Sequence, residues 1–184
     1  MGTHPHKRNA PVSVRAAVIT ASTTRGLDDD KSGSWLAKRL QKEGHQVVAH
    51  QVVADDINTI TDALEAVVFD NEAQVVLLNG GTGISGADVT IEAVRPLLEK
   101  ELTAFAVLFA MLSYEEIEAA AILSRACAGV VFGRAVVFCM PGSLKACKLA
   151  YKALISDELS HLMGHLQEGR PSPEKAPSDE VLLA

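Results

Sequence analysis

The sequence predicts a single α/β domain built around a mainly parallel β-sheet. Short apolar runs alternate along the chain with longer amphipathic stretches, which is the order expected of strand–helix–strand crossover units. Residues 74–78 (QVVLL) are apolar on both faces, as in a strand that helices cover on each side. The length of 184 residues suits one domain, and the hydrophobic content of 48% is enough for a sizeable core.

The strands and helices alternate in sequence. Leu36 and Leu40 recur at helical spacing in the first amphipathic stretch, and Gly44 suits its end. In the second stretch either Asp55 or Asp56 can act as the N-cap. The predicted strands are residues 15–21, 46–53, 74–78 and 135–140. The predicted helices are residues 31–44, 55–70, 105–118 and 143–166.

Two polar ends flank the folded part of the chain. Residues 1–13 lack periodicity and are predicted to form a flexible arm. Residues 170–184 (RPSPEKAPSDEVLLA) are rich in Pro, Ser and charge, which predicts a disordered tail. The domain is therefore expected to span residues 14–169. Within it, residues 121–132 fit a strand, a loop or both.

The composition excludes several classes of partner. A formal net charge of −6 argues against nucleic acid, whose phosphate backbone requires clustered Lys and Arg. The densest apolar run, residues 105–112, is too short to span a bilayer. The three cysteines form no CxxC pair and are odd in number, which argues against a disulfide framework or a zinc site. We therefore expect a cytoplasmic protein with no membrane partner.

A glycine-rich segment, residues 79–83 (NGGTG), directly follows the strand at 74–78. Glycine permits positive φ and a close approach to a ligand, and consecutive amides in such a turn can converge on an anion. Asp88 follows, and Thr90 is positioned to cap a helix that carries Glu92. An ordinary tight turn explains this segment equally well. It is neither a Walker A loop nor a clean dinucleotide fingerprint.

A second loop, Pro141-Gly142-Ser143, directly follows the strand at 135–140. Ser143 can cap the last helix without any ligand, or the loop can hold a phosphate at that helix's N-terminus. Ligands of open parallel sheets bind beyond the carboxyl ends of the strands, where both loops are predicted to lie. Ser124 and Arg125 are further candidates, since arginine beside a phosphate site has a clear use.

Four segments together resemble the molybdopterin-binding family. The resemblance covers residues 14–166 and implies a three-layer α/β/α fold with a mostly parallel sheet. It also implies a homotrimer, or a hexamer of two trimers, and a pocket for the phosphorylated pterin molybdopterin. Members of the family use ATP and Mg²⁺ to make adenylated molybdopterin. The segments are LNGGTGISGADVTI (78–91), FAMLSYEEI (109–117), AILSRACAGV (121–130) and VFCMPGSLKACKLA (137–150).

The resemblance also implies roles for individual residues. Asp88 matches the acidic residue required for Mg²⁺ and adenylyl transfer. Gly142 and Ser143 match residues that hold the pterin phosphate or ring. The other residues that fall in matching motifs are Ser22, Asp30, Ser32, Gly33, Gly80, Gly81, Thr82 and Gly83.

Two positions depart from the family pattern. Thr23 stands where the family usually has Asp, and Ala87 stands where many members have Arg. Two function classes stay open at this point. The first is an adenylyltransferase, in which a phosphate oxygen of molybdopterin attacks the α-phosphorus of ATP and no protein base is required. The second is a non-catalytic carrier of molybdopterin, which the missing acid at Thr23 favours.

Overall fold

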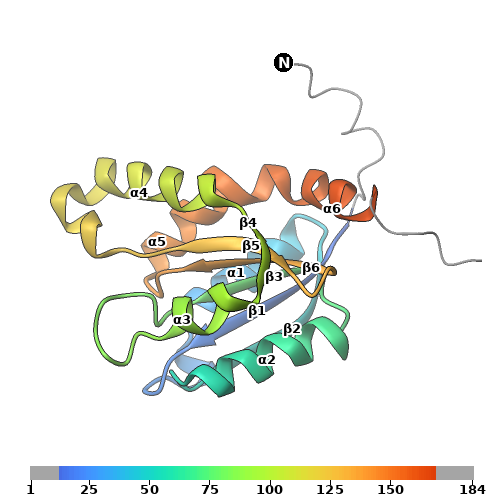
Figure 1. Cartoon of the computed structure of the whole chain (residues 1–184), viewed down its shortest axis with the longest axis horizontal. Helices are drawn as coiled ribbons and strands as arrows, with labels where there is room; N and C mark the ends of the chain where they lie inside the picture. The colour runs from blue at the N-terminus through green and yellow to red at the C-terminus, as the bar shows by residue number, and fades with distance from the viewer. Residues whose placement is uncertain (1–12, 169–184) are drawn as a thin grey trace, which may run out of the picture.

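The computed structural model describes residues 13–168, and they form one three-layer α/β/α domain (Figure 1). The central sheet has six strands in the order β2-β1-β3-β6-β5-β4. The pairs β1–β2, β1–β3 and β3–β6 are parallel, whereas β5 pairs antiparallel with both β6 and β4. The strands are β1 (Arg15–Ala21), β2 (Gln46–Val53), β3 (Val75–Asn79), β4 (Leu98–Glu101), β5 (Cys127–Val131) and β6 (Ala135–Met140). The predicted fold class is confirmed.

Helices cover both faces of the sheet. One face carries α1 (Lys31–Lys42), α4 (Thr103–Ile117), α5 (Leu144–Ala150) and α6 (Leu159–Glu168). The other carries α2 (Ile57–Phe69) and the short α3 (Thr90–Val94). The 3-10 turns are η2 (Leu27–Asp29), η3 (Arg95–Leu97), η4 (Glu118–Leu123) and η6 (Ser156–Glu158). No helix among residues 13–168 is long and apolar enough to cross a membrane.

The strand sequences divide their side chains between the two layers. In β3, Val75 and Leu77 point into the core beneath α1, whereas Val76 and Leu78 point into the core beneath α2. All four side chains are fully buried, as expected for a strand covered on both sides. The apolar run that predicted this strand is therefore a direct consequence of the three-layer arrangement.

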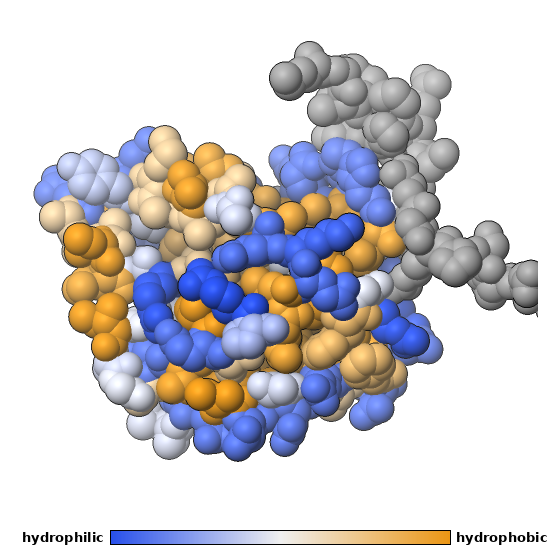
Figure 2. Space-filling model, viewed as in Figure 1, coloured by the Kyte–Doolittle hydropathy of each residue, from blue (hydrophilic) through white to orange (hydrophobic). Residues whose placement is uncertain are grey.

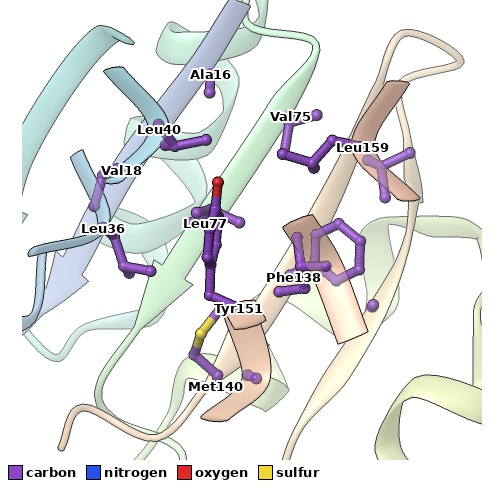
Figure 3. Close-up of a cluster of buried hydrophobic side chains, with 14 of the residues drawn as sticks. Ala16, Val18, Leu36, Leu40, Val75, Leu77, Phe138, Met140, Tyr151 and Leu159 are labelled. Carbon is purple, nitrogen blue, oxygen red and sulfur yellow. The ribbon is translucent and has the colours of Figure 1, made fainter. Parts of the chain in front are cut away.

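The last helical segment is interrupted, so the prediction of one continuous helix over 143–166 is wrong. Between α5 and α6 the chain forms a π-turn, η5 (Tyr151–Ile155), and then the 3-10 turn η6. The change of pitch keeps Tyr151, Ile155 and Leu159 fully buried on the sheet. Figure 3 shows Tyr151 lying against Leu77 and Met140 of the sheet, and Leu159 near Val75 and Phe138.

The structure decides between two sets of alternatives and corrects one further expectation. Asp56, not Asp55, caps α2, because its carboxylate accepts from the Thr59 amide at 2.9 Å. Thr90 does not cap α3; its hydroxyl donates to the Gly80 carbonyl at 2.8 Å. Residues 121–132 contain both alternatives, a turn followed by strand β5. The predicted arm and tail lie outside the described residues, apart from Ser13.

Candidate functional site

The candidate site lies where the carboxyl ends of β1, β3 and β6 meet (Figure 1). The chain passes from β1 to β2 on one side and returns to β3 on the other, which opens a crevice at the ends of these strands. Three loops surround it: residues 22–30 after β1, residues 80–89 after β3 and residues 141–143 after β6. Both loops singled out in the sequence therefore reach the same edge of the sheet.

Backbone conformation accounts for the glycines in the loop after β3. Gly80 has a φ of +93° and Gly81 a φ of +58°, a region that L side chains rarely adopt. A Cβ atom at Gly80 would overlap the Ala21 carbonyl, and one at Gly81 would crowd Thr90 and Asp55. Because Gly80 and Gly81 lack side chains, the loop can pack closely against Ala21 of β1 and Thr90 of α3.

Arg125 supports the same loop from outside the crevice. Its Nε donates to the carbonyl oxygens of Thr82 and Gly83, both at 2.9 Å. Its two terminal nitrogens contact the Glu92 carboxylate at 2.5 and 3.1 Å, and Nη2 also reaches the Asp88 carbonyl at 3.3 Å. The guanidinium is thus occupied by protein acceptors. The sequence predicts Arg125 as a ligand contact, but in the structure its side chain positions the loop after β3 instead.

The loop after β6 is held from two sides. The Ser143 hydroxyl caps α5 by accepting from the Ala146 amide at 3.2 Å. The Ser32 hydroxyl, in the first turn of α1, donates to the Gly142 carbonyl at 2.8 Å. A Cβ atom at Gly142 would overlap the Cα of Gly80, so the two predicted ligand loops abut directly.

The first of two hollows lies between these loops and the end of β1, with a volume of about 270 Å³. Two carboxylates, Asp55 and Asp88, line it together with glycine backbone. Its lining residues are Ala21, Ser22, Arg25, Asp55, Gly80, Gly81, Ala87, Asp88, Gly142 and Ser143.

Asp88 is held in its ionised form. Its carboxylate accepts from the hydroxyl and the amide of Ser85, at 2.6 and 2.9 Å. These hydrogen bonds, the hydroxyl first, outweigh partial burial and keep the pKa of Asp88 below its ordinary value. The charge of Arg125 acts in the same direction. A negative charge therefore stands at this position at neutral pH, beside backbone suited to anions.

Asp55 belongs to this site and was assigned in the sequence only as a possible helix cap. One of its oxygens accepts from the amide and the hydroxyl of Thr23, at 2.7 and 3.0 Å. Thr23 therefore fixes a carboxylate in the hollow, whereas an acid at that position would repel it. The sequence does contain a signal for this role. Two aspartates, Asp55 and Asp56, follow the strand, and only one is needed to cap the helix, so the other is free to line a site.

The second hollow, about 400 Å³, shares Arg25, Gly142 and Ser143 with the first. Its other lining residues are Asp29, Lys31, Ser32 and Leu144. Arg25, Lys31 and Asp29 give the second hollow one excess positive charge, whereas Asp55, Asp88 and the shared Arg25 give the first hollow one excess negative charge. A smaller recess of about 90 Å³ on the far side of Ser143 contains Ser124 and Pro141.

Asp30 and Gly33 lie beneath the hollows rather than in their walls. The Asp30 carboxylate caps α1 by accepting from the Gly33 amide at 2.8 Å and is 1% exposed. Thr82 is likewise buried, so it contributes its carbonyl to the Arg125 contact rather than a surface hydroxyl. Of the expected ligand residues, Ser22, Ser32, Gly80, Gly81, Asp88, Gly142 and Ser143 line the two larger hollows.

Within residues 13–168 no cluster of three or more His, Cys, Asp or Glu side chains can hold a metal ion. Mg²⁺ does not require such a cluster, because it is commonly held by one or two carboxylates together with substrate phosphates and water. The donor set of Asp55 and Asp88 therefore fits Mg²⁺ bound with a phosphorylated ligand.

The fold and the site define a class: a doubly wound α/β protein whose ligand loops meet at the carboxyl ends of β1, β3 and β6. The family described as "Probable molybdopterin binding domain" matches residues 17–161, and the chain belongs to that family. Molybdenum cofactor biosynthesis protein B of Bacillus cereus is 47% identical over 163 residues, covering 88% of this chain and 96% of the relative.

Two further similarities extend the comparison. A protein of Methanocaldococcus jannaschii named "Probable molybdopterin adenylyltransferase" is 39% identical over 171 residues, or 89% of this chain and 99% of that protein. A crystal structure of a molybdenum cofactor biosynthesis protein B matches with a TM-score of 0.82 and 47% identity. That match covers 86% of this chain and 99% of the other.

Proposed function

We propose that this protein binds molybdopterin and transfers AMP to it from ATP in molybdenum cofactor synthesis. The observation that carries the proposal is the pairing of two hollows of opposite net charge that share Arg25, Gly142 and Ser143. Such an arrangement suits two phosphorylated substrates that must meet. The names of the Bacillus cereus and Methanocaldococcus jannaschii relatives support the same assignment.

In this proposal the acidic hollow takes the phosphates of ATP, and the basic hollow takes the phosphate of molybdopterin. Asp55 and Asp88 hold Mg²⁺, which when bound neutralises phosphate charge. Gly80 and Gly81 line the same hollow, and their lack of side chains lets a ligand approach the backbone closely. Arg25 and Lys31 attract the pterin phosphate, and Ser143 lies between the two substrates.

The reaction requires no side-chain base. A phosphate oxygen of molybdopterin is already ionised near neutral pH and attacks the α-phosphorus of ATP. The new P–O bond forms as the bond between the α-phosphorus and its bridging oxygen to the β-phosphate breaks, and pyrophosphate leaves. The protein contributes orientation and fixed charges, which are the main sources of catalysis in phosphoryl transfer.

Incubation of the protein with molybdopterin, ATP and Mg²⁺, followed by mass detection of the product, tests this proposal. We expect adenylated molybdopterin and an equal amount of pyrophosphate, with neither formed when Mg²⁺ is chelated. If the protein binds molybdopterin but yields no adenylated product, it is a carrier and the enzymatic proposal fails.

We also propose that the chain assembles as a homotrimer, or as a hexamer of two trimers. Phe105 and Phe109 of α4 are buried against the sheet, but the helix is apolar on its outer side as well. Met111 is 60% exposed and Tyr114 is 62% exposed, and Ile122 in η4 is 85% exposed. Figure 2 shows apolar surface over α4 and along the edge where η4 meets the loop after β3.

An exposed apolar surface of this kind marks an interface, and closed symmetric rings are a common way to cover it. Because α4 and Ser124, the residue directly after η4, border the recess beside Ser143, copies of the same chain would also shield that side of the site. Light scattering at micromolar concentration is expected to give a trimer or hexamer mass, and a monomer mass would refute the assembly.

The three unpaired buried cysteines are consistent with a reducing compartment, and we place the reaction in the cytoplasm.

A further inference from the structure

A buried polar cluster lies directly beneath the two hollows. It consists of Thr20 on β1, Asp30 at the start of α1, His50 on β2 and Asn79 at the end of β3. One Asp30 oxygen accepts from the Thr20 hydroxyl at 2.7 Å and lies 2.9 Å from Nε2 of His50. Asn79 in turn donates to the Thr20 hydroxyl at 2.8 Å. Thr20, Asp30 and Asn79 are buried, whereas the His50 side chain is 20% exposed, so the cluster reaches from the interior to the surface at His50.

Two arms lead from Asp30 to the two ligand loops. Through Thr20, Asp30 is connected to Asn79, the residue that precedes Gly80. Through the first turn of α1, which it caps, Asp30 is connected to Ser32, whose hydroxyl binds the Gly142 carbonyl. The loops themselves touch at Gly80 and Gly142. One buried carboxylate is therefore bonded to the supports of both walls of the site.

The carboxylate is charged although it is buried. Burial acts to raise its pKa, but hydrogen bonds from His50, Thr20 and the Gly33 amide together lower the pKa of Asp30 below its ordinary value. Burial raises the pKa of the Cys147 thiol of α5, which faces this charge, to about 12, so that thiol stays neutral. A hydrogen bond to a charged group is stronger than one between neutral groups, so a buried carboxylate with several donors is a strong anchor.

We propose that Asp30 is a positioning residue, held by Thr20 and His50, that fixes the separation of the two ligand loops without touching a ligand. The identity of the ligand rests on the function proposed above, but the ordering of the loops does not. A glycine is required at position 33 for the same reason, because a Cβ there would overlap Asp30, Thr20 and His50.

Two conservative variants cut the arms separately. Thr20→Val keeps the shape of the side chain and removes the connection to the Gly80 loop, and Ser32→Ala removes the connection to Gly142. Ser34→Ala, in the same turn of α1, is the matched control for Ser32→Ala. Asp56→Asn is the control for Asp30→Asn, because Asp56 caps α2 in the same way, but its exposed carboxylate bonds Thr59 rather than a member of the cluster.

The first readout is hydrogen–deuterium exchange of the ligand-free protein. We expect the amides of residues 80–83 to exchange about tenfold faster in Thr20→Val, and those of residues 142–144 in Ser32→Ala. Asp30→Asn and His50→Ala should loosen both loops, and His50→Gln, which keeps a donor, should restore them. Unchanged exchange in both loops of Thr20→Val and Ser32→Ala would overturn the proposal.

The second readout is calorimetric titration with Mg²⁺ and α,β-methylene-ATP. Thr20→Val and Ser32→Ala should each weaken binding, and the double variant should lose less than the sum because both act on one unit. If the binding losses of Thr20→Val and Ser32→Ala add up fully in the double variant, the two loops are not held by one shared carboxylate. If the unmodified protein does not bind this probe, the proposed nucleotide site fails, while the exchange measurement still decides the role of Asp30.

Discussion

The two ligand loops reach the same place by different means. The loop after β3 is ten residues from Gly80 to Val89, begins with two glycines at positive φ, and depends on Arg125 from a distant segment. The loop after β6 has three residues and is fixed by a helix cap and one hydroxyl from α1. The first is shaped by backbone conformation and long-range contacts, and the second mainly by its own sequence.

The two loops therefore have different roles: the long loop carries the charged group of the site, and the short loop separates the two hollows. The long loop can present the Asp88 carboxylate and two glycines without side chains to one hollow, because the Arg125 side chain supports it from outside that hollow. The short loop has little freedom, so Gly142 and Ser143 form a fixed boundary between the two hollows. Changes in the long loop should therefore affect turnover and affinity most, while changes in the short loop should be modest.

The largest effect is expected for Asp88→Asn. An acid beside phosphates is repulsive unless a cation lies between them, so losing this charge should weaken Mg²⁺ binding. Turnover should fall by roughly two orders of magnitude or more, as when a charge-stabilising group is removed. The Asn carbonyl can still accept from Ser85, so the loop should keep its shape. Metal-free pterin binding should be unchanged or slightly tighter.

Adenylated product formed under saturating ATP measures this loss, with Asp62→Asn on the exposed side of α2 as the control. Asp55→Asn is expected to give a loss of the same kind, since both carboxylates line one hollow. If Asp88→Asn turns over at the unmodified rate, Asp88 is not part of the catalytic site.

Gly81→Ala should have the next largest effect. The new side chain would hold a φ of +58° and meet Thr90 and Asp55, so strain and overlap act together. Strain of this kind costs about 1–3 kcal/mol, and we expect nucleotide affinity to fall by ten- to a hundredfold. Gly86→Ala in the same loop meets no neighbouring atom and is the matched control. Equal affinities for the two variants would contradict the role of backbone conformation.

Arg125→Ala is expected to have a smaller effect on affinity, and it tests whether the loop after β3 needs the support of this side chain. It removes the donor to the Thr82 and Gly83 carbonyls without altering any residue that lines the two larger hollows. Affinity for the nucleotide should fall about tenfold, with Arg125→Lys intermediate because Lys lacks the planar fork. Arg134→Ala, where the guanidinium lies over Phe69, is the control. If titration gives Arg125→Ala the same affinity as Arg134→Ala, the contacts of Arg125 with the loop do not contribute to binding.

Local patterns predicted much of the fold and both loops. Apolar runs marked β1, β2, β3 and β6, because buried strands must be apolar. Strand β4, with the sequence LEKE, escaped notice because it is a mostly exposed edge strand with few apolar residues. The break at Tyr151 could not be foreseen either, since it follows from how the last helix packs on the sheet.

For the site, the sequence located residues but not always their roles. The motifs predict Asp30, Gly33 and Arg125 as ligand contacts, but these residues lie behind the loops. Asp30 and Arg125 bond partners that are distant in the chain, which a linear pattern does not reveal. Asp55 was considered only as a helix cap, since nothing in a linear sequence distinguishes the aspartate that caps from the one that faces the hollow. Positions where the lack of a side chain matters, as at Gly80 and Gly142, were the easiest to place at the hollows.

The smallest expected effect is that of Ser143→Ala, and it decides whether the short loop only ends a strand. As a cap, the Ser143 hydroxyl satisfies the Ala146 amide, and its loss should lower the free energy of unfolding by about 1 kcal/mol. As a boundary of both hollows, the same hydroxyl would also contact a phosphate, and affinity for molybdopterin would then fall as well. Asp56→Ala removes a cap of the same kind at a side chain that lines neither hollow, and it supplies the reference.

Denaturant unfolding and calorimetric titration on the two variants separate the roles. Both variants should lose stability, because each leaves a helix without its side-chain cap. Only Ser143→Ala should lose affinity, by about three- to tenfold if a single neutral hydrogen bond is removed. If the two variants bind molybdopterin equally well, Ser143 acts only as a cap, and the boundary between the hollows depends on Gly142 and its contact with Ser32.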